Sequence, residues 1–441
     1  MDCRVEIPRD FDCQVVLPVS KSIAARALII NALMPVVCNH DLFNSFKTKE
    51  EGVGSENDSS ECTSFLVEQQ SITPQCDDID ILTKALNSDR NLINVGDSGA
   101  AMRFLTAFYA CREGRAVTLD GSERLRQRPV GPLVDALRLM GASIDYLGNE
   151  GYPPFKISGK RLNGGSVSIK GDVSSQFVSA LLMIAPVAGG MTMTLEGEVM
   201  SRPYIDMTMA VMRHYGVDAR WKKSGNKSQI IVPPGHYIMK PLAIEGDWSA
   251  ASYWFALKAL LPQSRIVLSP LCNNSLQGDK AIVEMMAPLG VNARFDGNNT
   301  VVLFSDNSSL VPTHYERDMA ATPDLVPTLA VTLCLMRVPF SLTGVRNLRI
   351  KESDRLEALR EELSKLGYSL EVGDNILSYN GNHVEPQGEI IIDPHGDHRI
   401  AMAMSLAATR HKIIIKDAKV VTKSYPGWWE ALRAVNRDRK S

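Results

Sequence analysis

The sequence lacks any hydrophobic run long enough to cross a membrane as a helix. The longest apolar stretch, residues 177–191, is interrupted by Pro186 and two glycines and falls short of the roughly 20 residues that a bilayer requires. The first residues, MDCRVEIPRD, do not show the basic and then apolar pattern of a secretory signal. These absences predict a cytoplasmic protein with no membrane partner.

Paired cysteines and metal-ligand spacings are also missing. The eight cysteines form no C-x-x-C pair and no Cys/His spacing typical of a zinc site. We therefore expect reduced thiols, no disulfide and no metal. The net charge of −2 and the aromatic content of 6% disfavour nucleic acid as a partner, because such binding needs basic surfaces and stacking rings.

What the sequence does contain is a long repeat. Four of the Gly-Asp pairs begin at residues 96, 171, 246 and 396, so these four are separated by 75, 75 and twice 75 residues. The same spacing, extended backward and into the wide gap, reaches Lys21 and Ala321. All six positions begin an apolar, helix-like run: KSIAARALIINAL, GDSGAAMRFLTAFYA, GDVSSQFVSALLMIAP, GDWSAASYWFALKALL, ATPDLVPTLAVTLCLM and GDHRIAMAMSLAA.

Each run is expected to form the first helix of a repeated unit. Strand-like segments precede most of them, at residues 14–17, 92–95, 166–170, 242–245 and 389–392. Amphipathic second helices follow and end at Gly141, Gly216 and Gly367. A chain of 441 residues is too long for one ordinary core. The pattern predicts an α/β fold of six units in two lobes, with the apolar first helices buried inside each lobe.

One segment departs from this pattern. Residues 46–74 include the polar run KTKEEGVGSENDSSECTS, which has no hydrophobic periodicity. We expect a surface insertion there that carries no chemistry.

Positive charges recur at the expected helix starts. Lys21 and Arg26 lie in the first turns of the first run, and Arg355 and Arg399 lie near the starts of later helices. A cation at a helix N-terminus opposes the helix dipole, so its repeated placement there indicates a bound anion. Openings rich in Gly, Ser and Ala would let the anion approach the free N–H groups. For any one residue alone, a plain cap or a solvated charge is the alternative.

A series of motifs runs along the chain between residues 14 and 430: LPVSKSIAAR, GDSGAAMR, GSERLRQRP, GDVSSQF, SRPYID, GDWSAASY, PDLVPTLA, NLRIKESDRL, GDHRIAMA and KSYP. In this order they resemble the motifs of the 5-enolpyruvylshikimate-3-phosphate synthase family. The resemblance implies the two-lobed enolpyruvyl-transferase fold, with three βαβαββ units in each lobe. Lobe 1 would comprise residues 1–20 and 246–441, and lobe 2 would comprise residues 21–245.

The resemblance also implies a reaction and its ligands. The enolpyruvyl group of phosphoenolpyruvate would pass to the 5-hydroxyl of shikimate 3-phosphate, with release of phosphate, in the shikimate pathway to aromatic amino acids. It implies no cofactor, and we expect a monomer. Shikimate 3-phosphate would contact Lys21, Ser22, Arg26, Ser174, Ser175, Gln176, Ser201, Tyr204, Asp324, Asn347 and Lys351. Phosphoenolpyruvate would contact Lys21, Gly99, Arg124, Gln176, Arg355, His398, Arg399 and Lys423.

Two carboxylates and one lysine are the catalytic candidates that the resemblance implies. The hydroxyl would add to C2 of phosphoenolpyruvate while C3 receives a proton, and phosphate would leave as C3 returns it. Asp324 would take the hydroxyl proton, Glu352 would serve C3, and Lys21 would assist at the hydroxyl or the leaving phosphate, with the division among the three left open. Neighbouring cations would keep Asp324 ionised, whereas burial would raise the pKa of Glu352 if it must arrive protonated.

Three positions depart from the family's usual residues. Asp97, Ala100 and Arg202 stand where asparagine, threonine and lysine are usual. Asp97 would add a negative charge near the expected phosphoenolpyruvate site.

Two alternatives come from different classes. UDP-N-acetylglucosamine enolpyruvyl transferases share the fold but place a reactive cysteine, or sometimes aspartate, in a mobile loop, where this chain has SERLRQRP. The other alternative is a non-catalytic repeat scaffold that binds anions at its helix ends.

Overall fold

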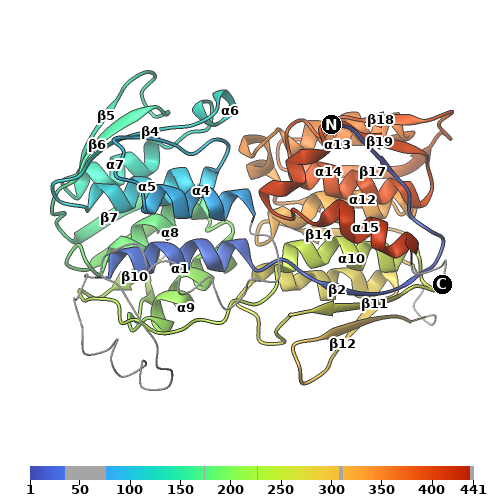
Figure 1. Cartoon of the computed structure of the whole chain (residues 1–441), viewed down its shortest axis with the longest axis horizontal. Coiled ribbons are helices and arrows are strands. Elements are labelled where there is room, and N and C mark those ends of the chain that lie inside the picture. The colour runs from blue at the N-terminus through green and yellow to red at the C-terminus, as the bar shows by residue number, and fades with distance from the viewer. Residues whose placement is uncertain (35–75, 173, 226, 307–310, 438–441) are drawn as a thin grey trace, which may run out of the picture.

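The chain forms two bodies that lie side by side (Figure 1). The computed structural model describes residues 1–34, 76–172, 174–225, 227–306 and 311–437, so the predicted insertion at 46–74 lies outside the described residues. One hydrophobic core joins buried residues between Val5 and Leu17 to those between Trp248 and Val435. A second core contains buried residues between Ile23 and Tyr237. The two bodies are called lobe 1 and lobe 2, in that order.

Lobe 2 contains two four-stranded sheets with the same topology. One has the order β3 (Leu92–Asn94), β4 (Ala116–Asp120), β6 (Phe155–Ser158) and β5 (Ser143–Tyr146). The other has the order β7 (Gly165–Lys170), β8 (Met191–Glu196), β10 (Lys227–Val232) and β9 (Arg220–Ser224). In both, the first two strands pair in parallel and the remaining pairs are antiparallel.

Lobe 1 repeats this topology in two four-stranded sheets and shortens it in a third. The orders are β2 (Asp12–Val16), β11 (Arg265–Ser269), β13 (Val301–Ser305), β12 (Val291–Phe295); β14 (Tyr315–Asp318), β15 (Phe340–Thr343), β17 (Ile376–His383), β16 (Tyr368–Val372); and β18 (Ile390–Ile392), β19 (Ile413–Ile415), β1 (Cys3–Val5). The predicted α/β class is confirmed. The complete set of six units stays a prediction, because one unit contains residues outside the described part of the chain.

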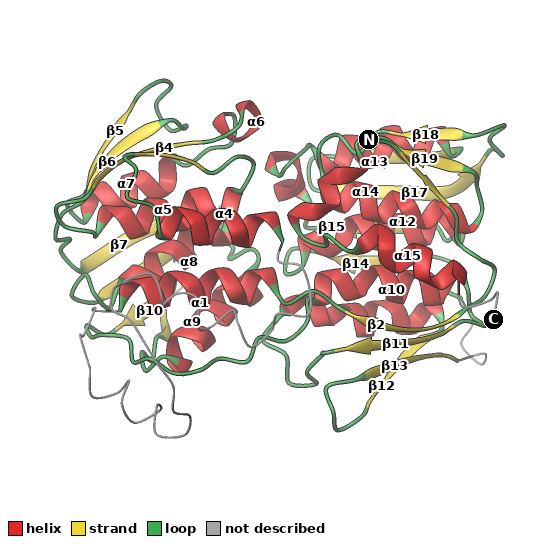
Figure 2. Cartoon of the chain, in the orientation of Figure 1, coloured by secondary structure: helices red, strands yellow, loops and turns green. Residues whose placement is uncertain are grey.

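The first helices of the units are buried, and the strands lie toward the outside of each lobe (Figure 2). They are α1 (Lys21–Leu33), α5 (Gly99–Ala110) and α8 (Ser175–Ile184) in lobe 2, and α10 (Trp248–Leu260), α12 (Val326–Leu335) and α14 (His398–Ser405) in lobe 1. Every residue of α12 is buried, because a helix that is apolar on all faces is stable only inside a core. Every residue of α14 is also buried, including His398 and Arg399 at its start. No helix among the described residues is long and apolar enough to span a bilayer.

The second helices end at the predicted glycines. The helices α7 (Gly131–Leu139), α9 (Arg202–His214) and α13 (Arg355–Lys365) precede Gly141, Gly216 and Gly367, whose φ angles are 95°, 93° and 83°. A Cβ at Gly367 would collide with the carbonyl oxygen of Val384, so the left-handed cap requires glycine there. The other α-helices among the described residues are α4 (Asp77–Leu86), α6 (Glu123–Arg126), α11 (Ile282–Met286) and α15 (Trp428–Arg437). Short 3₁₀ turns are η2 (Gly278–Ala281), η3 (Ala287–Leu289), η4 (Pro323–Leu325), η5 (Arg346–Ile350), η6 (Leu406–Thr409) and η7 (Ala418–Lys423).

The two segments that cross between the lobes pair with each other. The Ser20 N–H donates to Glu245 O at 2.8 Å, and the Asp247 N–H donates to Pro18 O at 2.8 Å. The predicted strand at 242–245 is wrong: these residues are irregular, and the segment makes only an isolated bridge at Gly246. The reason is that its neighbour here is a crossing segment and not a sheet. Asp247 caps α10 and also accepts the Lys21 N–H at 3.3 Å, so it ties the start of α1 to lobe 1.

Candidate active site

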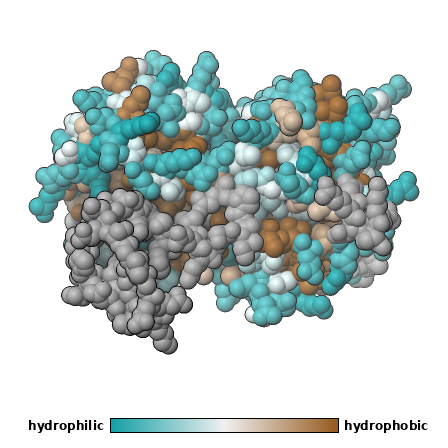
Figure 3. Space-filling view, viewed as in Figure 1, coloured by the Kyte–Doolittle hydropathy of each residue, from teal (hydrophilic) through white to brown (hydrophobic). Residues whose placement is uncertain are grey.

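A cavity of about 860 Å³ is lined by residues of both lobes. It adjoins a smaller cavity of about 500 Å³, and Arg128 and Glu352 line both. Where residues are coloured in Figure 3, hydrophilic ones predominate, including at the upper part of the boundary between the lobes. The predicted residues that line the larger cavity are Lys21, Ser22, Arg26, Gly99, Ser174, Ser175, Gln176, Ser201, Tyr204, Asp324, Asn347, Lys351, Glu352, Arg355, His398 and Arg399. Arg124 and Lys423 line the smaller one.

Arg26 is a buried cation, and its hydrogen bonds to the described residues all go to neutral acceptors. Helix α1 places its guanidinium in the lobe 2 wall with 3% exposure. It donates to Thr208 Oγ1 at 2.7 Å, to Ser179 Oγ at 3.1 Å, and to the Ser22 carbonyl at 2.7 Å. Burial lowers the pKa of Arg26 to about 10, so the group still carries its charge at neutral pH. A desolvated cation that is held only by hydroxyls and carbonyls can bind an anion without first breaking an ion pair with a carboxylate of the protein.

Lys21 lies one turn earlier on α1 and has an acidic partner. Its Nζ lies 2.9 Å from Asp78 Oδ2, and Asp78 is itself buried in α4. Burial alone would lower the pKa of Lys21, but the neighbouring acidic groups, of which Asp78 contributes most, together outweigh burial and the pKa is raised. Lys21 is therefore a fixed positive charge at the cavity.

Two further arginines approach the start of α5 because Gly99 has no side chain. A Cβ at Gly99 would lie 2.6 Å from Arg128 Nη1 and 2.9 Å from Arg103 Nη1. Among the described residues, the buried Nε atoms of both arginines find no hydrogen-bond partner, and neither do the two ring nitrogens of His398. Burial and then Arg128 hold the pKa of Arg103 well below its usual value. Unsatisfied buried donors beside one cavity indicate that an anionic ligand completes them.

Polar residues at two helix starts complete the lobe 2 wall. Ser174 caps α8 by accepting the Gln176 N–H at 3.3 Å. Ser201 precedes α9 with a left-handed φ of 53°. Its N–H donates to Ala320 O of lobe 1 at 2.8 Å, so this strained turn is fixed by a contact between the lobes.

Asp324 faces three cations on the lobe 1 wall. Its Oδ1 lies 2.9 Å from Arg355 Nη1 and 3.3 Å from Lys351 Nζ, and its Oδ2 lies 3.0 Å from Arg399 Nη2. Burial opposes ionisation, but Arg399, Lys351 and Arg355 hold the pKa of Asp324 well below its usual value. Asp324 is therefore ionised, as the sequence predicts.

Glu352 differs from its prediction. Its Oε2 lies 2.8 Å from Arg355 Nη2, and its Oε1 lies 3.6 Å from Lys423 Nζ and 3.8 Å from Arg128 Nη1. Burial would raise the pKa of Glu352, but Lys423, Arg128 and Arg355 hold it well below its usual value. The expectation that burial raises this pKa is wrong for the ligand-free site, because three cations outweigh desolvation.

Arg355 is the centre of a buried ion-pair network. Its side chain is 1% exposed and contacts Asp397 at 2.7 Å in addition to Asp324 and Glu352. Asp397 also caps α14 by accepting the Arg399 N–H. Because three carboxylates contact this guanidinium, Arg355 differs from Arg26, which contacts no carboxylate in the described part of the chain.

Side chains also reach across the boundary between the lobes. Arg124 Nε donates to the Glu352 carbonyl at 2.9 Å, and Arg124 Nη2 donates to the Lys351 carbonyl at 3.2 Å. From lobe 1, Lys423 Nζ donates to the Asp97 carbonyl at 2.9 Å. The Asp97 side chain accepts a short hydrogen bond from Ser122 Oγ. The smaller cavity is therefore closed by cations from both lobes.

Comparisons with known proteins identify the family. The family described as EPSP synthase (3-phosphoshikimate 1-carboxyvinyltransferase) matches residues 67–432. A relative named 3-phosphoshikimate 1-carboxyvinyltransferase from Bacteroides fragilis (strain YCH46) is 41% identical over 97% of this chain and 96% of its own length. The chain belongs to the EPSP synthase family.

Other members support the assignment in sequence and in fold. A Methanospirillum hungatei relative with the same name is 38% identical over 78% of this chain and 79% of its own length. The solved structure of EPSP synthase from Acinetobacter baumannii matches with a TM-score of 0.66 and 20% identity, over 99% of this chain and 98% of that one. Its identity is low, so this likeness supports the EPSP synthase fold alone.

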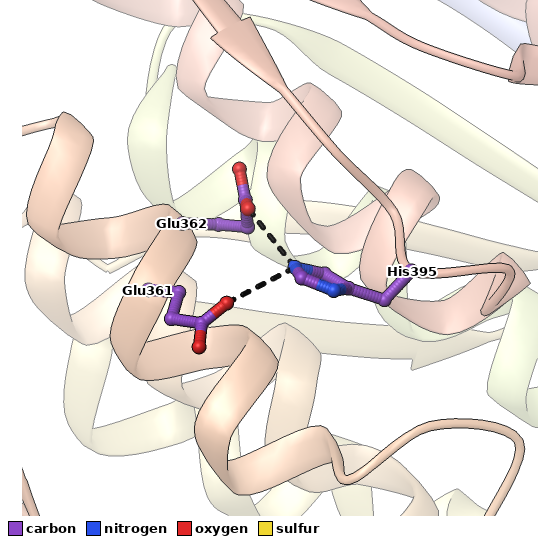
Figure 4. A group of neighbouring side chains, drawn as sticks. All are labelled: Glu361, Glu362 and His395. Atoms are coloured by element: carbon purple, nitrogen blue, oxygen red, sulfur yellow. Dashed lines mark hydrogen bonds and ion pairs between the residues drawn. The ribbon is translucent and has the colours of Figure 1, made fainter.

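One group outside the cavities has the ligand types of a metal site. Among the described residues, Glu361, Glu362 and His395 bring three such atoms within 4.8 Å of one another (Figure 4). His395 Nε2 lies 3.0 Å from Glu362 Oε1, and Lys365 Nζ lies 2.6 Å from Glu362 Oε2. The Asp393 N–H also donates to Glu362 at 3.0 Å. These donors occupy Glu362, so the group anchors the loop before α14 as an ion-pair cluster.

Sequence reasoning missed several residues beside the predicted EPSP synthase site. Arg103 and Arg128 lie in the quoted motifs GDSGAAMR and GSERLRQRP, so the motif signal for them was present. Asp78 lies next to the polar insertion, and no motif pointed to it. Asp397 was noted only as a helix start, because the sequence cannot show that Arg355 packs against it.

Proposed function

We propose that this chain transfers the enolpyruvyl group of phosphoenolpyruvate to the 5-hydroxyl of shikimate 3-phosphate and releases phosphate. The observation that carries the proposal is the convergence of buried cations from both lobes on two adjoining cavities. Several of their donors are buried and have no partner within the part of the chain that the structure describes. Two anionic substrates would satisfy them, and arginine suits both carboxylate and phosphate groups. Membership of the EPSP synthase family supports this reaction.

The two substrates would divide the site between its walls. Shikimate 3-phosphate would lie on the lobe 2 wall, where Arg26 offers a positive charge held by neutral acceptors. Lys21 would lie between the substrates. Phosphoenolpyruvate would lie toward Arg124 and Lys423, which close the smaller cavity from the two lobes. The full sets of contacts remain those that the motifs imply.

Asp324 would act as the base toward the 5-hydroxyl. The depressed pKa of Asp324 keeps it ionised and able to accept a proton. Asn347 and Lys351 would orient the ring hydroxyls, and Lys21 would assist at the hydroxyl or at the leaving phosphate. A base held by three cations is weak in the ligand-free site. Contact of those cations with the substrates would therefore strengthen it.

Glu352 would exchange the proton with C3 of phosphoenolpyruvate. In the ligand-free site, Lys423, Arg128 and Arg355 keep the pKa of Glu352 low. Phosphoenolpyruvate would draw Lys423 and Arg128 toward its own charges and add negative charge beside the carboxylate. Both effects raise the pKa of Glu352 toward a value suited to proton exchange. Substrate binding would thus favour the protonated form of Glu352 that the reaction at C3 requires.

The organisation of the molecule completes the proposal. Lobe 1 would comprise residues 1–20 and 246–441 and lobe 2 residues 21–245, and the active enzyme would be a cytoplasmic monomer. The crossing segments at residues 18–21 and 245–247 pair with each other. Such a connection allows the lobes to close over the substrates and to exclude water from the intermediate.

A phosphate-release assay tests the proposed function. Full-length protein is incubated with shikimate 3-phosphate, with phosphoenolpyruvate, and with both. We expect phosphate only with both substrates, together with a product that carries one enolpyruvyl ether. Release from phosphoenolpyruvate alone would indicate a phosphatase. No release with both substrates would overturn the proposal and favour a non-catalytic scaffold.

A further inference from the structure

A close contact joins the lobes beside the larger cavity. The first turn of α9 in lobe 2 packs on η2 in lobe 1. A Cβ at Gly278 of η2 would lie 2.5 Å from the Cβ of Pro203, so glycine permits this approach. Tyr204, the next residue of α9, lines the cavity. The contact therefore fixes a cavity residue of lobe 2 against a turn of lobe 1.

A buried carboxylate lies at this contact. Asp279 of η2 is 4% exposed. Its Oδ1 accepts the Tyr204 hydroxyl at 2.8 Å, and its Oδ2 accepts a short hydrogen bond from Ser249 Oγ of α10. One carboxylate thus binds a side chain from each lobe. Sequence patterns did not identify it, because its Gly-Asp pair falls outside the 75-residue spacing and outside the motifs of the family.

The hydrogen bonds continue to the proposed base. Arg399 Nη2 donates to Ser249 Oγ at 3.3 Å and to Asp324 Oδ2 at 3.0 Å. A hydroxyl has a single proton, so a Ser249 that donates to Asp279 can only accept from Arg399. The ionised Asp279 therefore fixes Tyr204 and Ser249 as donors toward it, and Arg399, which can only donate, continues the chain to Asp324.

We propose that Asp279 is a positioning residue that couples the shikimate 3-phosphate side of the site to the phosphoenolpyruvate side. It holds the Tyr204 hydroxyl from one lobe and, through Ser249, the Arg399 guanidinium from the other. The inference rests on the proposed function, since Tyr204 and Arg399 are assigned there to different substrates. Lobe closure brings the Tyr204 hydroxyl onto the carboxylate that Ser249 already contacts within lobe 1, so the two sides of the site are linked through Asp279.

Protonation of Asp279 gives this coupling a pH dependence. Burial raises the pKa of Asp279 to about 6. The Arg399 cation and the hydrogen bonds from Ser249 and Tyr204 act against this rise, and the negative charge of Asp324 adds to it. Above this pH the ionised carboxylate accepts both hydroxyls; below it, one oxygen becomes a donor and the bond directions change. The same shift means that the buried charge costs folding stability as the pH rises from 3.8 toward 6. A neutral isostere should therefore not destabilise the fold.

The Asp279→Asn variant of the full chain separates positioning from folding. Above pH 6, we expect kcat/KM for both substrates to fall about tenfold, the scale of losing a charged hydrogen-bond partner, with an equal or higher Tm. Below pH 6, the activities of wild type and variant should converge. If the Asp279→Asn variant kept the pH profile and the kcat/KM values of wild type, the inference would be overturned. A loss of activity that follows a lowered Tm and persists equally at all pH values would also overturn it.

Two further variants sharpen the test. Tyr204→Phe and Asp279→Asn should combine less than additively, because both break one chain of hydrogen bonds. Asp218→Asn is the matched control, since Asp218 pairs with Arg213 and Arg220 at the exposed end of α9, and it should leave kinetics unchanged. Inactive wild type would refute the proposed function itself. Active wild type with an unaffected Asp279→Asn variant would refute only the coupling.

Discussion

Two buried arginines, Arg26 and Arg355, lie at the same cavity and are held in different ways. Arg26 in lobe 2 donates to hydroxyls and carbonyls, so its charge is not neutralised by these contacts. Arg355 in lobe 1 lies among three carboxylates, so its charge is already balanced. The first arrangement is suited to receiving an anion, and the second to holding acids ionised and in position. The two lobes therefore contribute different chemistry to one site.

The largest expected effect concerns an acid held by the lobe 1 network. Asp324→Asn removes the proposed base but keeps the shape of the side chain, so kcat should fall by about 10²–10⁴-fold. Binding of shikimate 3-phosphate, measured by calorimetry, should change much less. Turnover close to that of wild type would show that the network serves only the structure.

The second effect is on stability. Arg355→Met leaves three buried carboxylates without their shared cation, so the free energy of unfolding should fall by about 3–5 kcal/mol. Urea denaturation measures this change. Arg360→Met on the exposed face of the same helix is the control and should give no detectable change. Equal stability of both variants would contradict the assignment of Arg355 to a structural network.

The acid dependence of stability gives a third test. The pKa of Glu352 lies well below its ordinary value of 4.5 in the folded protein, so its contribution to stability is complete above 4.5. That contribution is lost as the pH falls below 4.5 toward the folded pKa. Denaturation at a series of pH values should show Glu352→Gln losing less stability than wild type over this window. If the stability of the two proteins fell in parallel with pH, the ion pairs of Glu352 would not be the cause of the acid dependence.

The smallest effect concerns the unusual Asp97. Its carboxylate lies in the wall of the smaller cavity, and Asp97→Asn removes one negative charge near the proposed phosphoenolpyruvate site. We expect KM for phosphoenolpyruvate to fall about threefold, as for a partly screened charge, with kcat little changed. An increase in KM would show that the charge instead orders Ser122 and the neighbouring turn.

The sequence predicted the architecture better than the electrostatics. The repeat located the buried helices and the caps at Gly141, Gly216 and Gly367, because hydrophobic period and glycine conformation are local properties. It failed at 242–245, where the partner is a crossing segment and not a sheet. It also predicted the wrong direction for the pKa of Glu352 and did not identify Asp78 or Asp279 as part of the site. The reason is that the pKa and the roles of these residues depend on charges that the fold brings together from distant segments.

Calorimetric titration of two variants tests the central claim that each wall receives its own anion. Shikimate 3-phosphate is titrated into Arg26→Met and Arg124→Met, and phosphoenolpyruvate is then added to each loaded protein. The account predicts that Arg26→Met loses shikimate 3-phosphate binding by about 10²-fold or more. Arg124→Met should keep that binding and lose the response to phosphoenolpyruvate. Equal losses of both ligands in both variants would contradict the division of the site.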